Sequence, residues 1–376
     1  MVSGRLGDIL ESADVVLCCG AGGVGKTTTA AAVGLVAAEQ FERRVLVMTV
    51  DPARRLADAL GLHELDDKPV EVNVRGGGSR QGSPGGLDAL MLDPAASWKR
   101  LIAQLAPDSE TAERLLSNRV YQAVTQQFVQ SHDYLAMARL HDLRTTGEHD
   151  LVIVDTPPSR HALDFLDAPQ RMLEFFDSRL LHWMTNGSRG PANAAAAMFQ
   201  RVANRVLGGG FVADIGEFFA LLQMLSVGFV EASLAVSQVL SAPSTATLVV
   251  TTPEGGPIRE SKAFAGELAA RSMRLDGLVV NRAVPRRLLR PDVEKLAASW
   301  SADASGPPDG AGVRQMRGAA ASVYFRTVGA NQAAEPVLDE LVQQARWAAT
   351  VERFDGPLND LDGLRSFGLA LSGGLD

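Results

Sequence analysis

The stretch GAGGVGKTT, at Gly20–Thr28, decides the fold class of this chain. It satisfies the pattern G-x-x-x-x-G-K-[ST], and it lies between an apolar run at Asp14–Cys19 and an Ala-rich run at Lys26–Gln40. The first run is typical of a buried strand and the second of a helix, which is the context that this motif requires. The sequence therefore predicts a phosphate-binding loop between the first strand and the helix that follows it.

The residue types in this loop suit the binding of ATP and Mg²⁺. Glycines let the backbone curl so that successive N–H groups point inward, and the start of the helix adds a positive dipole. We expect Lys26 to contact the β- and γ-phosphates and the Thr27 hydroxyl to ligate Mg²⁺. The predicted ATP-binding residues of the loop are Gly20, Gly22, Gly23, Val24, Gly25, Lys26, Thr27 and Thr28. The structural alternative is a glycine-rich turn that binds nothing.

Two aspartates, Asp51 and Asp155, each follow a strand-like run. In an open α/β sheet, ligands bind beyond the carboxyl ends of the strands, so an acid at these positions faces the nucleotide. Asp155 is expected to serve Mg²⁺ or its water shell, and Asp51 to orient the water that attacks the γ-phosphate. Both could instead cap helices, because Asp51-Pro52 and Thr156-Pro157 are ordinary helix starts.

Strand-like runs and helical periodicity alternate along the chain, which predicts an α/β fold. Further strand-like runs occur at Arg44–Val50, His149–Asp155, Ala246–Thr251 and Asp276–Asn281. We expect a doubly wound, mostly parallel sheet of the P-loop NTPase type, in a single domain over residues 1–376. Helical insertions are predicted at about 94–145 and 162–242, and flexible loops at 75–86 and 301–312, which are rich in Gly, Ser and Pro.

The remaining expectations concern the outer elements of this domain. Val70–Val74 and Leu87–Leu92 flank a glycine-rich connection and are predicted to form a hairpin. Val323–Val328 is expected to be the final strand, and Glu335–Val351 the final helix. Asp51-Pro52 is expected to open a helix, with aspartate as its cap and proline as its first residue.

The composition is that of a globular protein, with 46% hydrophobic and 21% charged residues in 376. A formal net charge of -8 argues against a body that binds nucleic acid non-specifically. Met1–Asp14 lacks the basic start and apolar core of a secretory signal, so we expect a cytoplasmic protein. The only cysteines, Cys18 and Cys19, are adjacent and cannot build a stable zinc site or a disulfide framework within one chain.

Three motifs of the chain resemble those of a known family. GGVGKTT, TVDPA at Thr49–Ala53 and DTPPSRHAL at Asp155–Leu163 resemble the deviant Walker A, switch I and switch II motifs of the ArsA and GET-type ATPases. These include arsenite-pump ATPases and ATPases that deliver tail-anchored membrane proteins, and MinD and ParA are their cousins. The resemblance implies a dimer in which Asp51 activates water and Asp155 senses the metal and the γ-phosphate. It also implies that Asn281, and weakly a loop near Pro336, recognise adenine; by itself, Asn281 could be a turn residue.

Three departures from the family pattern affect this expectation. The signature lysine, which in the family reaches the partner's nucleotide across the dimer, is replaced by Ala21. The residues that follow the switch I Asp-Pro-Ala are Arg54 and Arg55, which supply positive charge or are simply solvated. Neither the CxxC pair of the GET-type dimer interface nor the thiols of the arsenite pumps are found.

Apolar residues at helical spacing fill the second insertion. One helix is expected to present an apolar face from Phe165 to Trp183, and a second, from Phe211 to Val236, is apolar nearly all round. Acidic residues interrupt the second run, which argues against a membrane span. Ordinary core or dimer packing and a groove for a hydrophobic protein client both fit this pattern.

The leading hypothesis is an ATP-hydrolysing dimeric switch that handles a protein client or a membrane-associated partner. The alternative is a weakly or non-hydrolysing subunit that pairs with a paralogous ATPase, motivated by Ala21. A metalloid-efflux ATPase fits poorly, because arsenite prefers thiolate ligands and two thiols in a core strand cannot form a three-coordinate site. A MinD or ParA type of positioning ATPase lacks a basic amphipathic helix at the C-terminus.

Overall fold

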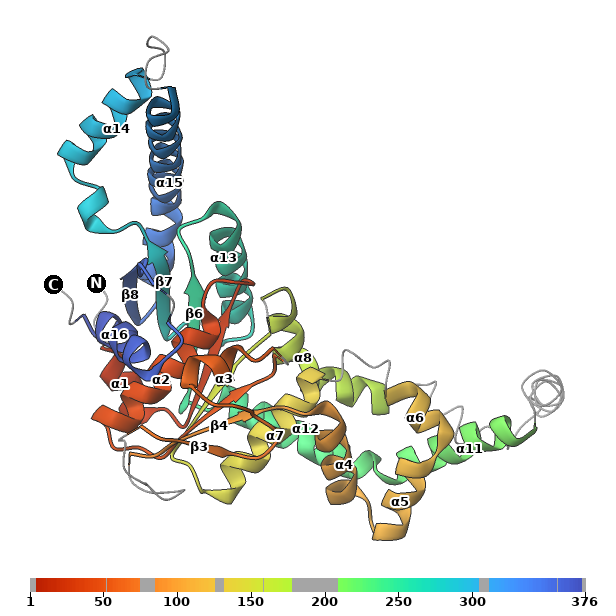
Figure 1. Ribbon diagram of the computed structural model, residues 1–376. Helices are drawn as coiled ribbons and strands as arrows, with labels where there is room; N and C mark the ends of the chain where they lie inside the picture. Colours follow the sequence, from red (N-terminus) through yellow and green to blue (C-terminus); the bar gives the residue numbers. More distant parts are fainter. Residues whose placement is uncertain are drawn as a thin grey trace.

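The computed structural model describes residues 5–51, 53–74, 85–125, 132–157, 159–177, 209–303, 311–356 and 358–373. Its centre is an eight-stranded sheet in the order β3-β4-β2-β5-β1-β6-β7-β8 (Figure 1). The strands are β1 (Val15–Gly20), β2 (Val45–Thr49), β3 (Val70–Val72), β4 (Leu87–Met91), β5 (Leu151–Asp155), β6 (Thr245–Thr251), β7 (Gly277–Ala283) and β8 (Trp347–Glu352). Only the β3–β4 pair is antiparallel. The predicted doubly wound, mostly parallel α/β fold is confirmed.

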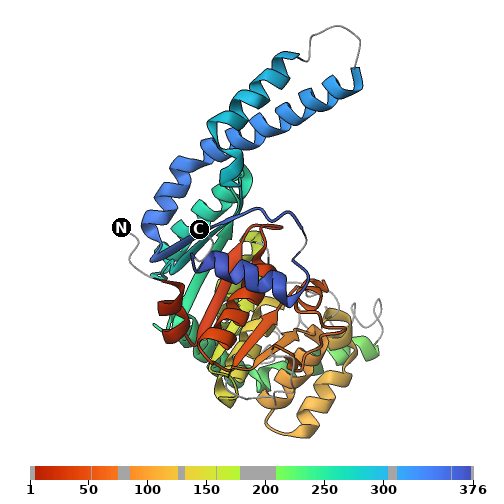
Figure 2. The ribbon, with the colours of Figure 1, turned by 60° about the vertical axis from the view of Figure 1, so that its left-hand side comes forward.

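Helices cover both faces of this sheet, which is why its central strands are apolar on both sides. One face packs against α1 (Leu6–Ser12), α2 (Lys26–Gln40), α3 (Arg55–Leu60) and α16 (Leu361–Leu371). The other face packs against α7 (His132–Thr146), α8 (Ser159–Phe176), α12 (Ser226–Ser241), α13 (Gly255–Ala270) and the end of α15 (Ala311–Gln344). In Figure 2, α16 lies against α2, and the two elements are in contact.

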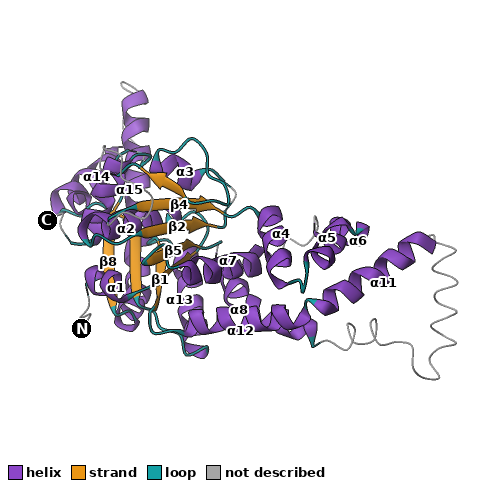
Figure 3. Cartoon of the chain, turned by 90° about the horizontal axis from the view of Figure 1, so that it is seen from below, coloured by secondary structure: helices purple, strands orange, loops and turns teal. Residues whose placement is uncertain are grey.

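Two groups of helices extend beyond the sheet. The first joins α7, α8 and α12 to α4 (Pro94–Leu105), α5 (Ser109–Ser117), α6 (Arg119–Thr125) and α11 (Gly209–Met224), and it reaches away from the strands in Figure 3. The second is an arm made of α14 (Pro291–Asp303) and α15, which rises from the β7–β8 edge in Figures 1 and 2. A short turn of 3-10 helix, η2 (Arg286–Leu288), links β7 to the arm.

Local sequence signals set the ends of several elements. Asp93 caps α4 by accepting hydrogen bonds from the N–H groups of Ala95 and Ala96, and Pro94 follows as the first helical residue. Small residues let α2 approach the sheet closely, because a Cβ at Gly34 would lie 2.7 Å from the Val47 side chain. The second contact holds the middle of α2 close against β2.

The expectations for the last part of the chain are partly wrong: Glu335–Gln344 is helical, as the end of α15, but the helix does not continue to Val351. Val323–Val328 is not a strand but the middle of the long helix α15. The last strand is β8, at Trp347–Glu352, which lies where the helix expected at Glu335–Val351 should end. A β-branched and aromatic run has strand propensity, but in this chain it packs in a helical hairpin, and tertiary context overrides propensity.

Two helix boundaries also differ from expectation. Asp51 does not cap a helix, because α3 begins at Arg55 with Arg54 as its N-cap, and the Asp51 carboxylate instead accepts the Ala53 N–H in a local turn; Pro52 lies outside the described residues. The long apolar segment is two helices, α11 and α12, bent by 50° at a break next to Leu225. Among the described residues, no single helix has the length and apolarity to cross a membrane, although Ala213–Met224 and Ser226–Ser241 meet that test as a bent pair.

Parts of several expectations lie outside the described residues. The loop expected at 75–86 falls mostly on residues 75–84, and residues 178–208 of the second insertion are likewise outside. Of the loop expected at 301–312, residues 304–310 are outside, whereas 301–303 end α14 and 311–312 begin α15. The predicted β3–β4 hairpin strands are present and pair antiparallel.

Candidate active site

The phosphate loop lies at the carboxyl end of β1, between this strand and α2. Gly20 has a φ of 148°, and a Cβ there would lie 2.1 Å from the Val250 carbonyl oxygen on β6. Gly23 and Gly25 also have positive φ, at 77° and 101°. Only glycine adopts such a path without strain, so the glycines of the motif are required by the shape of the loop itself.

Lys26 folds back across the loop. Its Nζ donates a hydrogen bond to the Ala21 carbonyl oxygen at 3.0 Å, and the residue is only 8% exposed. Burial lowers the pKa of Lys26, and the negative charge of Asp155 opposes that shift. The lysine therefore sits inside the curl of the loop, where a phosphate could replace the carbonyl as its partner.

Asp155 brings the loop together with two neighbouring strands. It ends β5, in register with Cys18 of β1 and with Thr49 of β2. Its Oδ2 accepts hydrogen bonds from the Thr27 hydroxyl at 2.7 Å and from the Thr49 hydroxyl at 3.1 Å. The parallel sheet thus places side chains that are far apart in the sequence around one carboxylate.

The second oxygen of this carboxylate lacks a partner. Asp155 is 1% exposed, and its Oδ1 has no hydrogen-bond partner among the described residues. Burial raises the pKa of Asp155, against the lowering effect of the Thr27 hydrogen bond and the Lys26 charge. A buried, unsatisfied carboxylate oxygen beside a threonine hydroxyl matches the oxygen ligands that Mg²⁺ prefers.

Asp51 follows β2 at the same edge but is less buried. Its Oδ1 accepts a hydrogen bond from the Ala53 N–H at 2.9 Å, and its Oδ2 forms an ion pair with Arg55 at 3.2 Å. Its own N–H donates to the Thr49 hydroxyl at 3.2 Å. Arg54 instead donates to the His63 carbonyl, so of the two arginines only Arg55 contacts Asp51.

Thr49 lies in the site, although the sequence analysis predicted no role for it. Its hydroxyl donates to Asp155 and accepts from the Asp51 backbone, which links the two acids. The Thr156 hydroxyl, also unassigned, donates to the Cys18 carbonyl at 2.8 Å and holds the end of β5 against β1. Both threonines lie within two residues of a strand-end aspartate, and this spacing in the sequence could have identified them as site residues.

The two residues expected on the adenine side, Asn281 and Pro336, lie in different elements, β7 and α15. Asn281, near the end of β7, donates from its Nδ2 to the Val24 carbonyl oxygen at 2.8 Å and so touches the phosphate loop. Pro336 was expected in a loop. It is instead an exposed residue inside α15. The helix expected from Glu335 onward already included this residue, so the helix expectation holds at Pro336 and the loop expectation is wrong.

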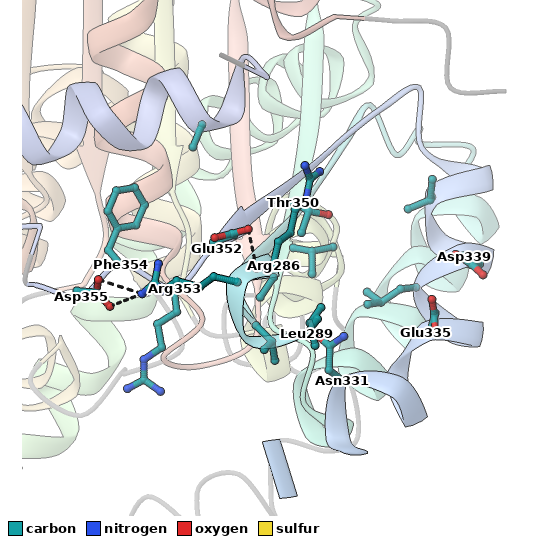
Figure 4. A pocket seen from close by; sticks show the side chains of 17 residues that line it. Arg286, Leu289, Asn331, Glu335, Asp339, Thr350, Glu352, Arg353, Phe354 and Asp355 are labelled. Carbon is teal, nitrogen blue, oxygen red and sulfur yellow. Dashed lines mark hydrogen bonds and ion pairs between the residues drawn. The ribbon is translucent and has the colours of Figure 1, made fainter. Parts of the chain in front are cut away.

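A separate cavity of about 750 Å³ opens between the end of the sheet and the base of the arm (Figure 4). Its walls come from η2, the ends of β7 and β8, and one side of α15, including Arg286, Glu335, Asp339, Thr350 and Glu352. Val280 lines the cavity, whereas its neighbour Asn281 contacts the phosphate loop, so adjacent residues of β7 serve the two places.

Comparisons with known proteins agree with this geometry. A family model described as "Anion-transporting ATPase" matches residues 13–304. The chain is 30% identical over 271 residues to an uncharacterized protein of Streptomyces coelicolor, a match that covers 72% of this chain and 62% of that protein. It is 29% identical over 213 residues to the ATPase GET3 of Malassezia globosa, covering 56% of each chain.

A third relative is matched over more of its length. The chain is 25% identical over 302 residues to an ATPase ASNA1 homologue of Trypanosoma cruzi, covering 73% of this chain and 75% of that protein. The chain spans less than two thirds of the length of the Streptomyces and Malassezia relatives.

Proposed function

The chain belongs to the anion-transporting ATPase family, whose model spans residues 13–304, and on that premise we propose that it binds ATP with Mg²⁺ and hydrolyses it as a dimeric switch. The observation that carries this proposal is the buried Asp155 carboxylate, which joins Thr27 and Thr49 while its Oδ1 stays without a partner among the described residues. A structural carboxylate would be fully paired at this depth.

In this proposal the loop holds the phosphates and the two threonine-linked acids complete the pocket. The backbone N–H groups from Gly22 to Thr28 and the Lys26 ammonium bind the phosphate chain, while Thr27 and Asp155 would hold Mg²⁺. The metal, when bound, would neutralise the charge that develops on the phosphate oxygens. Water then attacks the γ-phosphorus as the bond to the β–γ bridging oxygen breaks, which releases ADP and phosphate.

Asp51 is proposed to orient the attacking water. Both of its carboxylate oxygens are engaged, by the Ala53 N–H and by Arg55, and each oxygen keeps a second lone pair that can accept a hydrogen bond from water. The ion pair with Arg55 holds Asp51 only weakly, because the Arg55 side chain is 67% exposed and an exposed ion pair contributes little.

The test is a comparison of nucleotide binding and hydrolysis in the purified chain. Wild type should bind ATP in the presence of Mg²⁺, and Lys26→Ala should abolish that binding. Asp51→Asn should still bind ATP but lose hydrolysis by about a hundredfold, because positioning the water lowers the barrier only in the transition state. Folded wild-type protein without Mg²⁺-dependent affinity for ATP would defeat the proposal.

A second candidate function is a subunit that depends on a paralogous ATPase for activity, and Ala21 favours it. Ala21 is buried, with 3% exposure, and its carbonyl serves Lys26, so this position offers no charge to a partner's nucleotide. Hydrolysis should be measured for this chain alone and mixed with a paralogue that carries lysine at this position. Equal activity of the chain alone and in the mixture would remove this candidate.

A hydrophobic protein client is proposed to bind between α8 and α12. A hollow of about 630 Å³ there is lined by four apolar and three acidic residues, among others: Leu173, Phe176, Val227, Val230, Glu174, Asp177 and Glu231. The Val227 side chain is 66% exposed, whereas Phe229 on the same helix belongs to the core. A fluorescent helical Leu/Ala peptide should bind more tightly in one nucleotide state, and Val227→Asp should lower the affinity for the peptide. An affinity that changes neither with nucleotide nor with Val227→Asp would contradict the proposal.

The described cysteines do not fit metalloid transport. Burial raises the pKa of Cys18 and raises the pKa of Cys19 to about 12, so both stay protonated as thiols. Metalloids bind thiolates, and these two lie inside β1 under the phosphate loop. The parallel with arsenite pumps is therefore confined to the nucleotide site.

A further inference from the structure

The carboxamide of Asn281 is held in one orientation. Asn281 is 6% exposed; its Oδ1 accepts a hydrogen bond from the Arg282 N–H at 2.8 Å, and its Nδ2 donates to the Val24 carbonyl oxygen at 2.8 Å. Exchanging the oxygen and the nitrogen would set oxygen against oxygen and N–H against N–H. The donor of the carboxamide therefore points at the phosphate loop.

The backbone of β7 is shaped to achieve this. The register between β7 and β8 shifts between Val280 and Ala283, and Arg282 has a φ of 56°, which is uncommon for arginine. This turn directs the Arg282 N–H back to Asn281. Unusual backbone of this kind persists where the surrounding structure requires it, and it is most common at functional sites.

The hydrogen bond to Val24 sets the direction of a donor in the loop. In a planar trans peptide the C=O and the next N–H point in opposite directions, so fixing the Val24 carbonyl turns the Gly25 N–H away from Asn281. On the other side, the Gly25 carbonyl accepts the N–H and the hydroxyl of Thr29, both at 2.9 Å. A Cβ at Gly25 would lie 2.3 Å from the Asn281 Nδ2, which shows how closely the carboxamide fits the loop.

We propose that Asn281 is a positioning residue that fixes the Val24–Gly25 peptide, so that the Gly25 N–H faces the phosphate chain of the nucleotide. This inference rests on the proposed function of the loop and differs from the adenine contact that the family resemblance implies. A residue that shapes the phosphate cradle affects every triphosphate equally, whereas a residue that reads adenine affects only adenine nucleotides.

The experiment compares the binding of ATP, GTP and inorganic tripolyphosphate, each with Mg²⁺, by titration calorimetry. Asn281→Ala should weaken all three by a similar factor of about ten, because one buried hydrogen bond and its unpaired carbonyl are involved. Asn331→Ala removes a carboxamide from the α15 side of the other cavity and should change none of them. A loss confined to ATP, or no loss for any probe, would overturn the inference.

A nucleotide-free measurement separates this inference from the proposed function. Hydrogen exchange of residues 20–30 in unliganded protein should be faster in Asn281→Ala than in wild type, with the rest of the sheet unchanged. Asn281→Asp, which keeps the bond from Arg282 but cannot donate to Val24, should show the same change if the alanine variant folds poorly. Wild type that binds no nucleotide would defeat the function alone, while unchanged exchange in both variants would defeat the positioning role.

Discussion

At the scale of single residues, the site is organised around Asp155, a carboxylate whose position is unfavourable without a ligand. Three groups that stabilise its negative charge are present, in the Thr27 and Thr49 hydroxyls and the Lys26 ammonium, yet burial still raises its pKa. Buried polar groups without partners are rare in folded proteins. The residue therefore costs stability in the empty protein, and a cation would remove that cost.

Replacing Asp155 with asparagine should separate folding from catalysis. Asp155→Asn can still accept the hydrogen bonds of Thr27 and Thr49, so we expect a folded protein with an unfolding midpoint close to that of wild type. It loses the charge that would hold Mg²⁺, so hydrolysis should fall by about a hundredfold or more. Steady-state ATPase assays test this, with Asp58→Asn on the exposed side of α3 as the control. Full activity in Asp155→Asn would remove Asp155 from the metal site.

The raised pKa of Asp155 also predicts a pH dependence. Between the ordinary aspartate value and the raised value, the folded metal-free protein holds a proton that the unfolded chain has lost, so its stability falls as pH rises through this window. Mg²⁺ requires the ionised form, so Mg²⁺-ATP affinity should rise with pH through the same window and level off above it. Calorimetry in buffers of different ionisation enthalpy should detect proton release on binding. The release should disappear in Asp155→Asn.

The sequence predicted some of these residues and not others. Lys26, Thr27, Asp51 and Asp155 stand in motifs or at strand ends, so their place at the carboxyl edge of a parallel sheet could be foreseen. Their roles in catalysis stay predictions. The Thr49 link, the ion pair of Asp51 with Arg55 and the contact of Asn281 with Val24 depend on side-chain directions across three strands, which no local pattern encodes.

At the scale of secondary-structure elements, prediction succeeded where one signal dominated. The helix expected at Lys26–Gln40 is α2 with the same limits, because a glycine loop precedes it and an apolar strand lies on either side. It failed at Val323–Val328, where β-branched and aromatic residues suggested a strand inside α15. In that segment the decisive interaction is the packing of α15 on α14, the helix that precedes it, and the strand propensity of a six-residue run does not register this packing.

The two helical insertions pack together around one aromatic cluster. Phe229 of α12 is 1% exposed and stacks on Phe176 of α8, with ring centroids 5.0 Å apart. Trp98 of α4 and Tyr134 of α7 approach the same ring at 6.2 and 6.1 Å. Four helices from separate parts of the chain therefore share a single contact point.

Phe229→Ala should loosen these two insertions without unfolding the sheet. Loss of a buried phenylalanine side chain costs about 3–5 kcal/mol, and here the loss falls on α4, α7, α8 and α12 together. Hydrogen exchange should rise in peptides from these helices and stay unchanged in β1, β2 and β5. Val227→Ala, an exposed position on the same helix, should change stability by no more than about 0.5 kcal/mol. Equal destabilisation of the strands would show that insertion and sheet unfold as one unit.

At the scale of the whole molecule, nucleotide site, helical insertion and arm radiate from different parts of one sheet. The carboxyl edge of β1, β2 and β5 carries the phosphate loop and the acids, while the arm leaves the sheet beyond β7 (Figure 1). Helix α15 leads from the arm directly into β8. Strand β8 pairs with β7, which carries Asn281. Arm and phosphate loop are thus joined through two neighbouring strands.

The arm has an inner and an outer side that should respond differently to mutation. Met316 and Val323, with 74% and 51% exposure, lie on the outer side, whereas Ala321 is 1% exposed where α15 runs along α14. The double variant Met316→Glu/Val323→Glu should leave the free energy of unfolding within about 0.5 kcal/mol of wild type, because no packing is lost. Ala321→Glu forces a charge between the helices and should raise hydrogen exchange throughout α14 and the first half of α15.

Both variants should keep wild-type affinity for ATP, measured by calorimetry, since neither position touches the β7–β8 pair. A double variant that is clearly less stable, or that changes the mass measured by light scattering, would mean that another surface covers the outer side of the arm in solution.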